Sequence, residues 1–297
     1  MVIKIIPRIF GGLGNQLFAY AAARRLALVN NAELVLDHIS GFRFDKEYQQ
    51  IYQLDNFNIP VRKANRMELL EPFSRVKRYL LRRVNLYRPF GKRCYLSQEG
   101  IDFDSRVLDL RPSCRRLYLE GYWQSERYFK DIDDVIRKDL KMTPPVDEIN
   151  QTMVEKIKKH NAVAVHVRFF DNPEKPLGHN ASIDYYQRAI EEMQIRVSGA
   201  HYYIFSDRPD AAMNLIKLPV TRVTLVDHNT SFQNAYADLW LMTHCKHFII
   251  ANSTFSWWGA WLSESQNKII IAPGFKIREG KTAWGFDGLL PDNWIKM

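Results

Sequence analysis

Apolar runs alternate with amphipathic stretches along most of the chain. Residues 2–9 form an apolar run that predicts a strand, and residues 32–37 form another. Between them, residues 16–30 carry apolar side chains at helical spacing, which predicts a helix. A strand, a helix and a second strand in this order are typical of a parallel sheet, because the helix returns the chain to the edge where the first strand began.

The second half of the chain repeats this alternation. Its expected strands are residues 162–168, 201–207, 222–226, 247–252 and 268–272. Its expected helices are residues 182–197, 209–215, 231–245 and 255–265. Five strands with helices between them predict a doubly wound sheet. Pro144 and Pro145 end the pattern that precedes this half, so we expect two domains, residues 1–143 and 144–297.

The stretch between these two regular parts is harder to assign. We expect a strand at residues 117–123 and an amphipathic helix at residues 125–142. Residues 40–115 are less regular and include a basic segment at residues 75–93. Two doubly wound domains in tandem predict a ligand in the cleft between them.

Composition narrows the class of protein. The chain has 297 residues, of which 46% are hydrophobic and 25% charged, and this excludes a disordered or collagen-like protein. Its net charge of +9 favours an anionic partner, such as nucleic acid, a membrane surface or a phosphorylated small molecule. We see no apolar run of the ~18 residues that a membrane span needs and no signal peptide. Three cysteines without a CxxC pair predict neither disulfides nor zinc, as expected of a reducing cytosol.

A glycine cluster follows the first expected strand. Gly11, Gly12 and Gly14 allow a tight turn, and Asn15 and Gln16 come next. The helix that follows would aim its N–H groups and positive dipole end at an anion. The cluster is not a P-loop, because Gly-Lys-Ser/Thr is absent, and the third glycine of a dinucleotide fingerprint is also missing. We expect these residues to contact a ligand; an ordinary strand-to-helix turn is the alternative.

His166, Arg168 and Asp171 stand at the end of the strand expected at residues 162–168. Strand alternation puts His166 and Arg168 on the same side. An arginine there suits a diphosphate, which it can bind with two hydrogen bonds. Asp171 can orient the arginine or accept a proton. The alternatives are a structural Arg–Asp pair and a histidine that is only a hydrogen-bonded part of the core.

Two more clusters follow expected strands. Ser206 and Asp207 end one strand, and the carboxylate can accept two N–H bonds from guanine or bind a ribose. It can equally cap the next helix. The other cluster consists of Asn252, Ser253, Thr254 and Phe255. Small hydroxyl residues at a strand-to-helix junction are good phosphate ligands, and they are also ordinary helix caps.

Other candidate sites are weaker. Asp102 with Asp104, and Asp131 with Asp133, form Asp-x-Asp triplets that can hold Mn²⁺ on a nucleotide diphosphate. One lies in an irregular region and the other on an expected helix, so we predict no metal site. The basic segment is either a solvated helix face or a surface that rests on an anionic membrane. We find no zinc knuckle, RRM signature or helix-turn-helix pattern and expect no nucleic acid.

Four segments carry a resemblance to a known family. GGLGNQLFAYAAARRLA near the amino terminus looks like the signature GGLGNQ(L/M)FQYA, and EGYWQSERYF at residues 120–129 is similar to a GYWQSE segment. HVRFFD stands where the family has HxRRxD, and IIANSTFSWWGAWL at residues 249–262 looks like the carboxy-terminal signature. Through these segments the sequence resembles the bacterial α-1,2-fucosyltransferases of glycosyltransferase family 11.

The resemblance implies a GT-B fold, with two Rossmann-like α/β domains facing across a cleft. It implies transfer of fucose with inversion from GDP-β-L-fucose to the 2-hydroxyl of a terminal galactose, without a metal ion or cofactor. The amino-terminal domain would be the acceptor side and the carboxy-terminal domain would bind GDP-fucose. The implied roles are Arg168 on the diphosphate, Asp207 on guanine, Ser253, Thr254 and Phe255 as the donor-binding turn, and Gly14, Asn15 and Gln16 reaching the donor from across the cleft.

One departure from the family pattern concerns the diphosphate. Phe169 and Phe170 stand where the family has a second arginine and a glycine, so one positive charge is missing. The leaving diphosphate gains charge in the transition state, and fixed donors such as Arg168 stabilise it. A general base would assist the attacking hydroxyl. Asp171 is our nomination for that base, with His166 and His179 as rivals.

Two alternative functions remain at this point. One is a GT-B glycosyltransferase with another donor sugar, and the other is a non-catalytic protein that binds a sugar nucleotide or glycan. We expect the acceptor to be a galactose-terminated oligosaccharide or lipid-linked glycan that contacts residues 38–115. We also expect a cytoplasmic protein whose basic segment rests peripherally on the inner face of the cell membrane.

Overall fold

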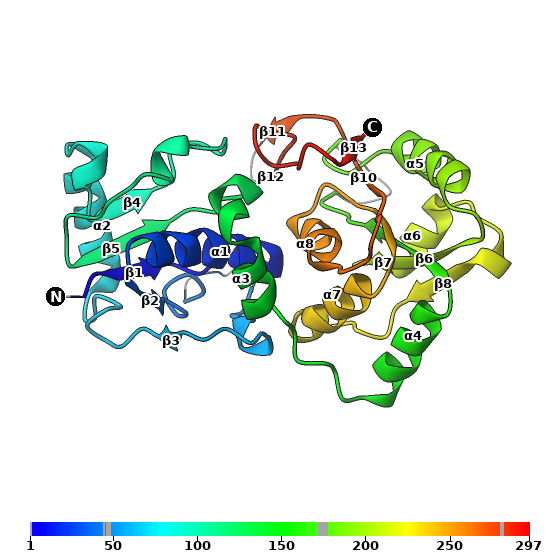
Figure 1. The fold of residues 1–297 in the computed structure, drawn as a ribbon, viewed down its shortest axis with the longest axis horizontal. Coiled ribbons are helices and arrows are strands. Elements are labelled where there is room, and N and C mark those ends of the chain that lie inside the picture. Colours follow the sequence, from blue (N-terminus) through cyan, green and yellow to red (C-terminus); the bar gives the residue numbers. More distant parts are fainter. Residues whose placement is uncertain (1, 44, 46–48, 172–177, 280–281) are drawn as a thin grey trace. The chain divides into compact units, whose positions relative to one another are not determined.

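The computed structural model describes residues 2–43, 45, 49–171, 178–279 and 282–297. The chain divides into two units (Figure 1): unit 1 is Met1–Lys141 with Asp287–Leu289, and unit 2 is Met142–Phe286 with Leu290–Met297. The division after Lys141 falls two residues before the expected boundary. The segment Asp287–Leu289 was expected in the second domain but belongs to unit 1, where the backbone N–H of Asp287 donates to Asp102.

Unit 1 is built on a parallel sheet. Its strands are β1 (Lys4–Pro7), β2 (Glu33–Leu36), β3 (Arg62–Lys63), β4 (Tyr95–Ser97) and β5 (Arg116–Glu120), in the order β3-β2-β1-β5-β4 within the described residues. Every pairing in this sheet is parallel. The expected strand–helix–strand unit at the amino terminus is therefore confirmed. Strands β3 and β4 lie in the segment where the sequence showed little order, because two or three residues are too short for a visible alternation.

Helices cover the sheet of unit 1. They are α1 (Leu13–Val29), α2 (Ser74–Leu86) and α3 (Asp133–Asp139), with 3₁₀ turns at Leu54–Asn56, Phe90–Lys92, Ser105–Val107, Glu126–Tyr128 and Lys130–Ile132. Figure 1 shows α1 lying across the sheet, against β1 and β2, and α2 lying against β4. The single helix expected at residues 125–142 is wrong: two 3₁₀ turns precede the short α3. Ser125 begins this region as the cap of the first turn.

Unit 2 is built on a second parallel sheet. Its strands are β6 (Asn161–Val167), β7 (Ala200–Ser206), β8 (Val223–Val226), β9 (His247–Ile249), β10 (Ile270–Ala272) and β13 (Ile295–Lys296), in the order β13-β10-β9-β6-β7-β8 within the described part of the chain. All of these pairings are parallel. The five strands expected here are present. Strand β13 joins them because the last residues of the chain pair with β10.

Helices lie on both faces of this second sheet (Figure 1). They are α4 (Glu148–Lys158), α5 (Ile183–Arg196), α6 (Pro209–Leu215), α7 (Ala235–Thr243) and α8 (Thr254–Leu262), with 3₁₀ turns at Val220–Arg222 and Phe232–Asn234 and an antiparallel hairpin of β11 (Ile277–Glu279) and β12 (Thr282–Trp284). Strand β6 is buried on both faces from Ala162 to Val167, as parallel strands between helices are. Val163, Val165 and Val167 pack into the cluster that includes α5 and α6.

One helix of unit 2 was not predicted from the periodicity. Helix α4 was not expected; it begins at the cap Asp147, whose carboxylate accepts the backbone N–H of Asn150. Among the described residues, no helix has the length and apolar character of a membrane span.

Candidate functional site

Two neighbouring strand ends bring Arg168 and Asp207 together in unit 2. Strands β6 and β7 are paired in parallel with Val167 opposite Ser206, so the next residue of each strand leaves the sheet at the same edge. Arg168 Nη1 lies 3.1 Å from Asp207 Oδ2. Asp207 Oδ1 accepts the backbone N–H of Phe169 at 3.1 Å. Asp207 therefore orients Arg168, which was one role that the sequence suggested for Asp171.

The two phenylalanines that depart from the family pattern have different surroundings. Phe169 is buried in the core of unit 2. Phe170 is 43% exposed, and its ring centroid lies 5.6 Å from the guanidinium carbon of Arg168. A guanidinium over an aromatic face is attracted to its π-electrons. Arg168 is thus held from two sides, by the carboxylate of Asp207 and by the ring of Phe170, while 36% of its side chain stays exposed.

Asp171 pairs with His179 and not with Arg168. Its Oδ1 lies 2.7 Å from His179 Nδ1, and its Oδ2 accepts the backbone N–H of His179 at 2.8 Å. The carboxylate is almost fully buried, whereas the His179 side chain is 23% exposed. A carboxylate on Nδ1 fixes the proton of a neutral imidazole on that nitrogen, which makes Nε2 the acceptor atom of the ring. Asn252 joins the pair, because its Nδ2 donates to the carbonyl of His179 at 2.8 Å.

His166 is part of the packed interior. It is 5% exposed, its Nδ1 lies 2.8 Å from Ser256 Oγ, and its ring contacts Phe255. Burial, with a smaller contribution from the charge of Arg168, lowers the pKa of His166 to about 3. The ring is therefore neutral near pH 7. This geometry fits the structural alternative for His166 and gives no support to the catalytic role expected from the sequence.

Helix α8 starts where strand β9 has ended. Ser253 is its N-cap, and its Oγ accepts the backbone N–H of Phe255 at 3.3 Å. The contact between His166 and Ser256 ties the first turn of this helix to β6. The structure thus shows the ordinary helix cap that was the alternative for Ser253, and phosphate binding by this turn stays a prediction. A helix start with its positive dipole end lies next to the strand that carries Arg168.

Ser206 and Asp207 do not cap the helix that follows them. The N-cap of α6 is Arg208, and no side chain caps it. Ser206 Oγ accepts the backbone N–H of Arg208 at 3.0 Å and so shapes the turn. The capping alternative for Asp207 is wrong, because both of its oxygens face the Arg168 loop.

The glycine cluster lies in unit 1, at the end of β1. Gly11 has φ +75°, a conformation that favours glycine, and Gly12 is the N-cap of α1. Helix α1 begins three residues earlier than expected, so Gly14 lies in its first turn. Asn15 is partly exposed, and its Oδ1 accepts Gln124 Nε2 at 2.7 Å.

The expected ligand contact of Gln16 is not supported. Its side chain is fully buried, and its Nε2 donates to the carbonyls of Gly11 and Ile51. Its Oε1 accepts the backbone N–H of Gln53. Gln16 therefore uses its amide to hold the glycine turn against residues 51–53, and it has no exposed surface for a ligand.

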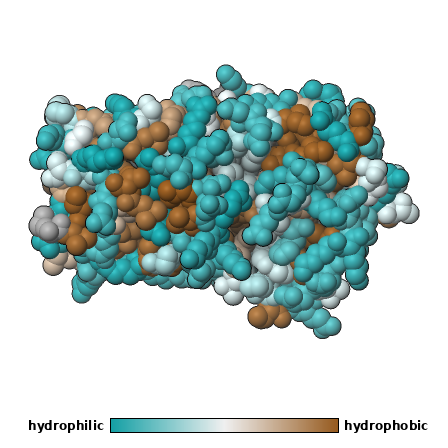
Figure 2. All heavy atoms as spheres, viewed as in Figure 1, coloured by the Kyte–Doolittle hydropathy of each residue, from teal (hydrophilic) through white to brown (hydrophobic). Residues whose placement is uncertain are grey.

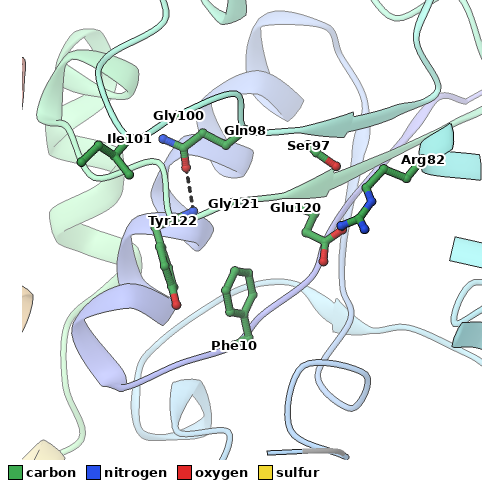
Figure 3. Close-up of a pocket in the computed structure, with 9 residues that line it drawn as sticks. All are labelled: Phe10, Arg82, Ser97, Gln98, Gly100, Ile101, Glu120, Gly121 and Tyr122. Atoms are coloured by element: carbon green, nitrogen blue, oxygen red, sulfur yellow. Dashed lines mark hydrogen bonds and ion pairs between the residues drawn. The ribbon is translucent and has the colours of Figure 1, made fainter. Parts of the chain in front are cut away.

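Unit 1 has a cavity of about 310 Å³ at the carboxyl ends of β1, β4 and β5 (Figure 3). Its lining consists of Phe10, Arg82, Ser97, Gln98, Gly100, Ile101, Glu120, Gly121 and Tyr122. The rings of Phe10 and Tyr122 lie 4.8 Å apart between centroids. Glu120 Oε2 lies 4.0 Å from Arg82 Nη1 and accepts a hydrogen bond from the hydroxyl of Tyr95 at 2.6 Å. Aromatic faces beside charged and amide groups suit a polar ligand with an apolar face.

Sequence reasoning missed this cavity, although part of its wall lies in a recognised segment. Gln98 Oε1 accepts the backbone N–H of Tyr122 (Figure 3). It also accepts the backbone N–H of Trp123. A Cβ on Gly121 would lie 2.5 Å from the Cβ of Gln98, so the turn requires glycine there. The Gly-Tyr-Trp motif at residues 121–123 was the available signal.

The Asp-x-Asp carboxylates have protein partners. Asp104 binds Arg106, which lowers the pKa of that carboxyl, and Asp131 binds Arg25 with the same effect. Asp102 accepts the backbone N–H of Asp287. Within the described parts of the chain, no group of three or more His, Cys, Asp or Glu residues has the arrangement of a metal site.

Known relatives place the chain among glycosyltransferases. It is 28% identical over 309 residues to an α-1,2-colitosyltransferase of Escherichia coli, covering 99% of this chain and 98% of that protein. It is 27% identical over 317 residues to the Escherichia coli O-antigen biosynthesis glycosyltransferase WbnK, covering 97% and 98%. A galactoside 2-α-L-fucosyltransferase of Caenorhabditis elegans is 30% identical over 174 residues, with 53% of this chain and 46% of that protein covered.

Solved structures show a related fold. A variant of FUT1 from Arabidopsis thaliana in complex with GDP matches with a TM-score of 0.55 and 13% identity, covering 99% of this chain and 76% of that one. The α-1,6-fucosyltransferase NodZ soaked with GDP-fucose matches with a TM-score of 0.52 and 14% identity, covering 88% and 93%. The GT-B fold class expected from the resemblance is thereby confirmed.

The family model for glycosyl transferase family 11 matches residues 3–283, nearly the whole chain. This match and the relatives show that the protein is a glycosyltransferase, so the alternative of a non-catalytic binding protein is not supported. The chain belongs to glycosyltransferase family 11.

Proposed function

We propose that this enzyme transfers L-fucose from GDP-β-L-fucose to the 2-hydroxyl of a terminal galactose on a glycan, with inversion to an α-linkage. The observation that carries the proposal is the fixed guanidinium of Arg168 in a family 11 glycosyltransferase. Arg168 stands at the end of β6, between Asp207 and Phe170. The neighbouring strand β9 is the one that leads into α8. This arrangement suits a nucleotide diphosphate.

The donor side of the reaction would lie in unit 2. As the sugar–phosphate bond breaks, the leaving diphosphate gains negative charge, and fixed donors stabilise this charge more in the transition state than in the ground state. Arg168 and the first turn of α8, capped by Ser253, are such donors. Because these groups supply positive charge, we propose that transfer needs no metal ion and continues in EDTA.

We propose His179 as the general base, with Asp171 as its positioning residue. The sequence favoured Asp171 as the base, but the side chain of Asp171 is only 2% exposed and both of its oxygens hold His179. The imidazole is the more accessible member of the pair. Its Nε2 can take the proton of the acceptor hydroxyl, and the carboxylate stabilises the imidazolium that forms.

The acceptor galactose would bind in the cavity of unit 1. Sugar rings have an apolar face and polar edges, and this cavity offers the rings of Phe10 and Tyr122 beside Glu120, Arg82 and Gln98. A cavity of about 310 Å³ is at the lower end of the range for small-molecule sites, which is enough for one or two sugar rings.

A second donor has one observation in its favour. The relative named as a colitosyltransferase aligns along almost the full length of this chain. Colitose is fucose without its 3-hydroxyl, and a site that hydrogen-bonds that hydroxyl rejects the deoxy sugar strongly. The test is a turnover assay with GDP-fucose, GDP-colitose and GDP-mannose on galactose-terminated oligosaccharides, with the product linkage determined by NMR. An α-1,2-fucosylated product supports the proposal. If the enzyme turns over GDP-colitose in preference to GDP-fucose, colitose and not fucose is the donor sugar.

A further inference from the structure

Helix α2 is fixed to unit 1 by one face. Arg78 forms a buried ion pair with Asp37, and Asn85 Oδ1 accepts the backbone N–H of Cys94 at 2.6 Å. Leu81 packs against the core cluster that contains Val35. These positions recur every three or four residues, so they form one side of the helix, which we call the inner face. Arg78 was expected to be part of a basic surface, but it belongs to this inner face.

The opposite face of α2 is apolar and exposed. Successive residues of a helix are rotated by about 100°, so a residue two positions after an inner-face residue points away from the protein. Val76 and Leu80 stand two positions after Ser74 and Arg78, and they are 56% and 54% exposed. Val84 is 52% exposed on the same side, and Phe73 and Tyr87 extend the row beyond the two helix ends.

This apolar row is unusual for a surface helix. Single exposed apolar side chains are common, and Figure 2 shows such residues at several places on the visible surface. On α2, however, the apolar row lies on the exposed side of the helix, whereas an ordinary surface helix buries its apolar stripe. A row of this kind is typical of a contact with another apolar phase or partner.

Positive charges flank the row. Lys77 and Arg83 lie on the two sides of the row and are exposed, and α2 contains no acidic residue. Two copies of α2 placed face to face would bring like charges together, which opposes self-association. An apolar row with basic flanks instead fits the boundary between acyl chains and anionic headgroups of a lipid bilayer.

We propose that α2 binds in the plane of an anionic lipid surface. Val76, Leu80 and Val84 enter the acyl boundary, while Lys77 and Arg83 contact the phosphates of the headgroups. The inner face stays folded on unit 1 through Arg78, so binding does not require the helix to detach. This inference does not depend on the identity of the donor sugar.

The test is co-sedimentation of the full chain with vesicles of phosphatidylglycerol and phosphatidylcholine, and with vesicles of phosphatidylcholine alone, at low and high salt. The double variant Lys77→Glu/Arg83→Glu should lower binding to the anionic vesicles about tenfold or more, since each basic residue contributes to the attraction. Lys156→Glu/Lys159→Glu is the matched control: it makes the same change in net charge on α4 and its C-cap in unit 2, and it should bind like the unmodified protein.

The apolar row has its own variant, Leu80→Gln/Val84→Gln. It keeps every charge, so it should retain the salt dependence but bind several-fold more weakly. Melting temperature and turnover of a soluble acceptor should not change in any of these variants, because Arg82, which lines the cavity, is left intact. The proposal is overturned if the unmodified protein binds neutral and anionic vesicles equally well, or if it binds neither kind. It is also overturned if the control loses as much binding, or if light scattering shows a dimer that only the Leu80→Gln/Val84→Gln variant abolishes.

Discussion

The carboxylate of Asp207 holds the guanidinium of Arg168 at 3.1 Å, across the ends of two parallel strands. The two side chains are 36% and 27% exposed, so the contribution of the pair to folding stability is small, about 0–1 kcal/mol. Its importance is geometric: the fork of the guanidinium is fixed at the edge where parallel sheets bind their ligands. Substitutions at this pair should therefore change catalysis more than stability.

Arg168→Lys should lower kcat/KM by about 10²–10³-fold, because a lysine ammonium cannot reproduce the two parallel hydrogen bonds to a diphosphate. Steady-state kinetics with GDP-fucose measures this loss, and thermal unfolding should show a melting temperature within a few degrees of the unmodified enzyme. Arg188→Lys on α5 is the control, since Arg188 pairs with Asp184 on the helix surface. Turnover of the Arg168 variant close to normal would remove this residue from the diphosphate.

His179→Ala should lower kcat by about 10²–10⁴-fold with little change in the KM for the donor, as expected for loss of a general base. Added imidazole should restore part of the activity. Asp171→Asn should lower kcat less than His179→Ala does, because the imidazole remains but loses the carboxylate that orients it. His201→Gln, at the other end of β7 from Asp207, is the control. If His179→Ala keeps its full kcat, the base is another group.

The pair of Arg168 with Asp207 also shows what a sequence can and cannot predict. Strand periodicity placed both residues at strand ends, and parallel pairing then requires those ends to share an edge. The choice between Asp207 and Asp171 as the partner of Arg168 depends on how the loop after β6 turns. That turn is set by Asn180, which accepts the backbone N–H groups of Phe170 and Asp171. No local pattern contains this information.

Gln16 shows that the sequence can also indicate a ligand contact where the side chain is buried. A polar residue directly after a glycine turn resembles a ligand contact, but its partners are backbone groups of residues 51–53, which are distant in sequence. Helix α2 was visible only as a basic segment, because its inner face is formed by polar Ser74, Arg78 and Asn85 with only Leu81 as an apolar anchor. Periodicity could not show which of its sides is buried.

His166 predicts an acid-sensitive contribution to stability. Its pKa is about 3 in the folded protein and near 6.5 in an unfolded chain, so between these values the unfolded state binds the extra proton. Stability from this group is complete above pH 6.5 and is lost as pH falls toward 3, by at most about 1.4 kcal/mol per pH unit. His166→Gln should therefore show a smaller loss of unfolding free energy between pH 7 and pH 5 in urea titrations.

The comparison with the unmodified protein is essential for that measurement. Burial raises the pKa of Asp238 to about 7, which makes its contribution fall as pH rises and so opposes the effect of His166. The difference between variant and unmodified protein removes this background. An unchanged pH dependence in His166→Gln would show that the pKa of His166 is the same in the folded and the unfolded protein.

The cavity of unit 1 gives the last prediction. Tyr122 presents its ring beside Phe10, and its side chain is 38% exposed, so Tyr122→Ala should remove a stacking face without disturbing the core. We expect the KM for the acceptor to rise about tenfold, which corresponds to about 1.4 kcal/mol of lost binding. The KM for the donor should not change, because the donor side is assigned to unit 2. Tyr79→Ala on α2, whose ring is 51% exposed and outside the cavity, is the control. A rise in the donor KM instead would place the nucleotide, and not the acceptor sugar, in this cavity.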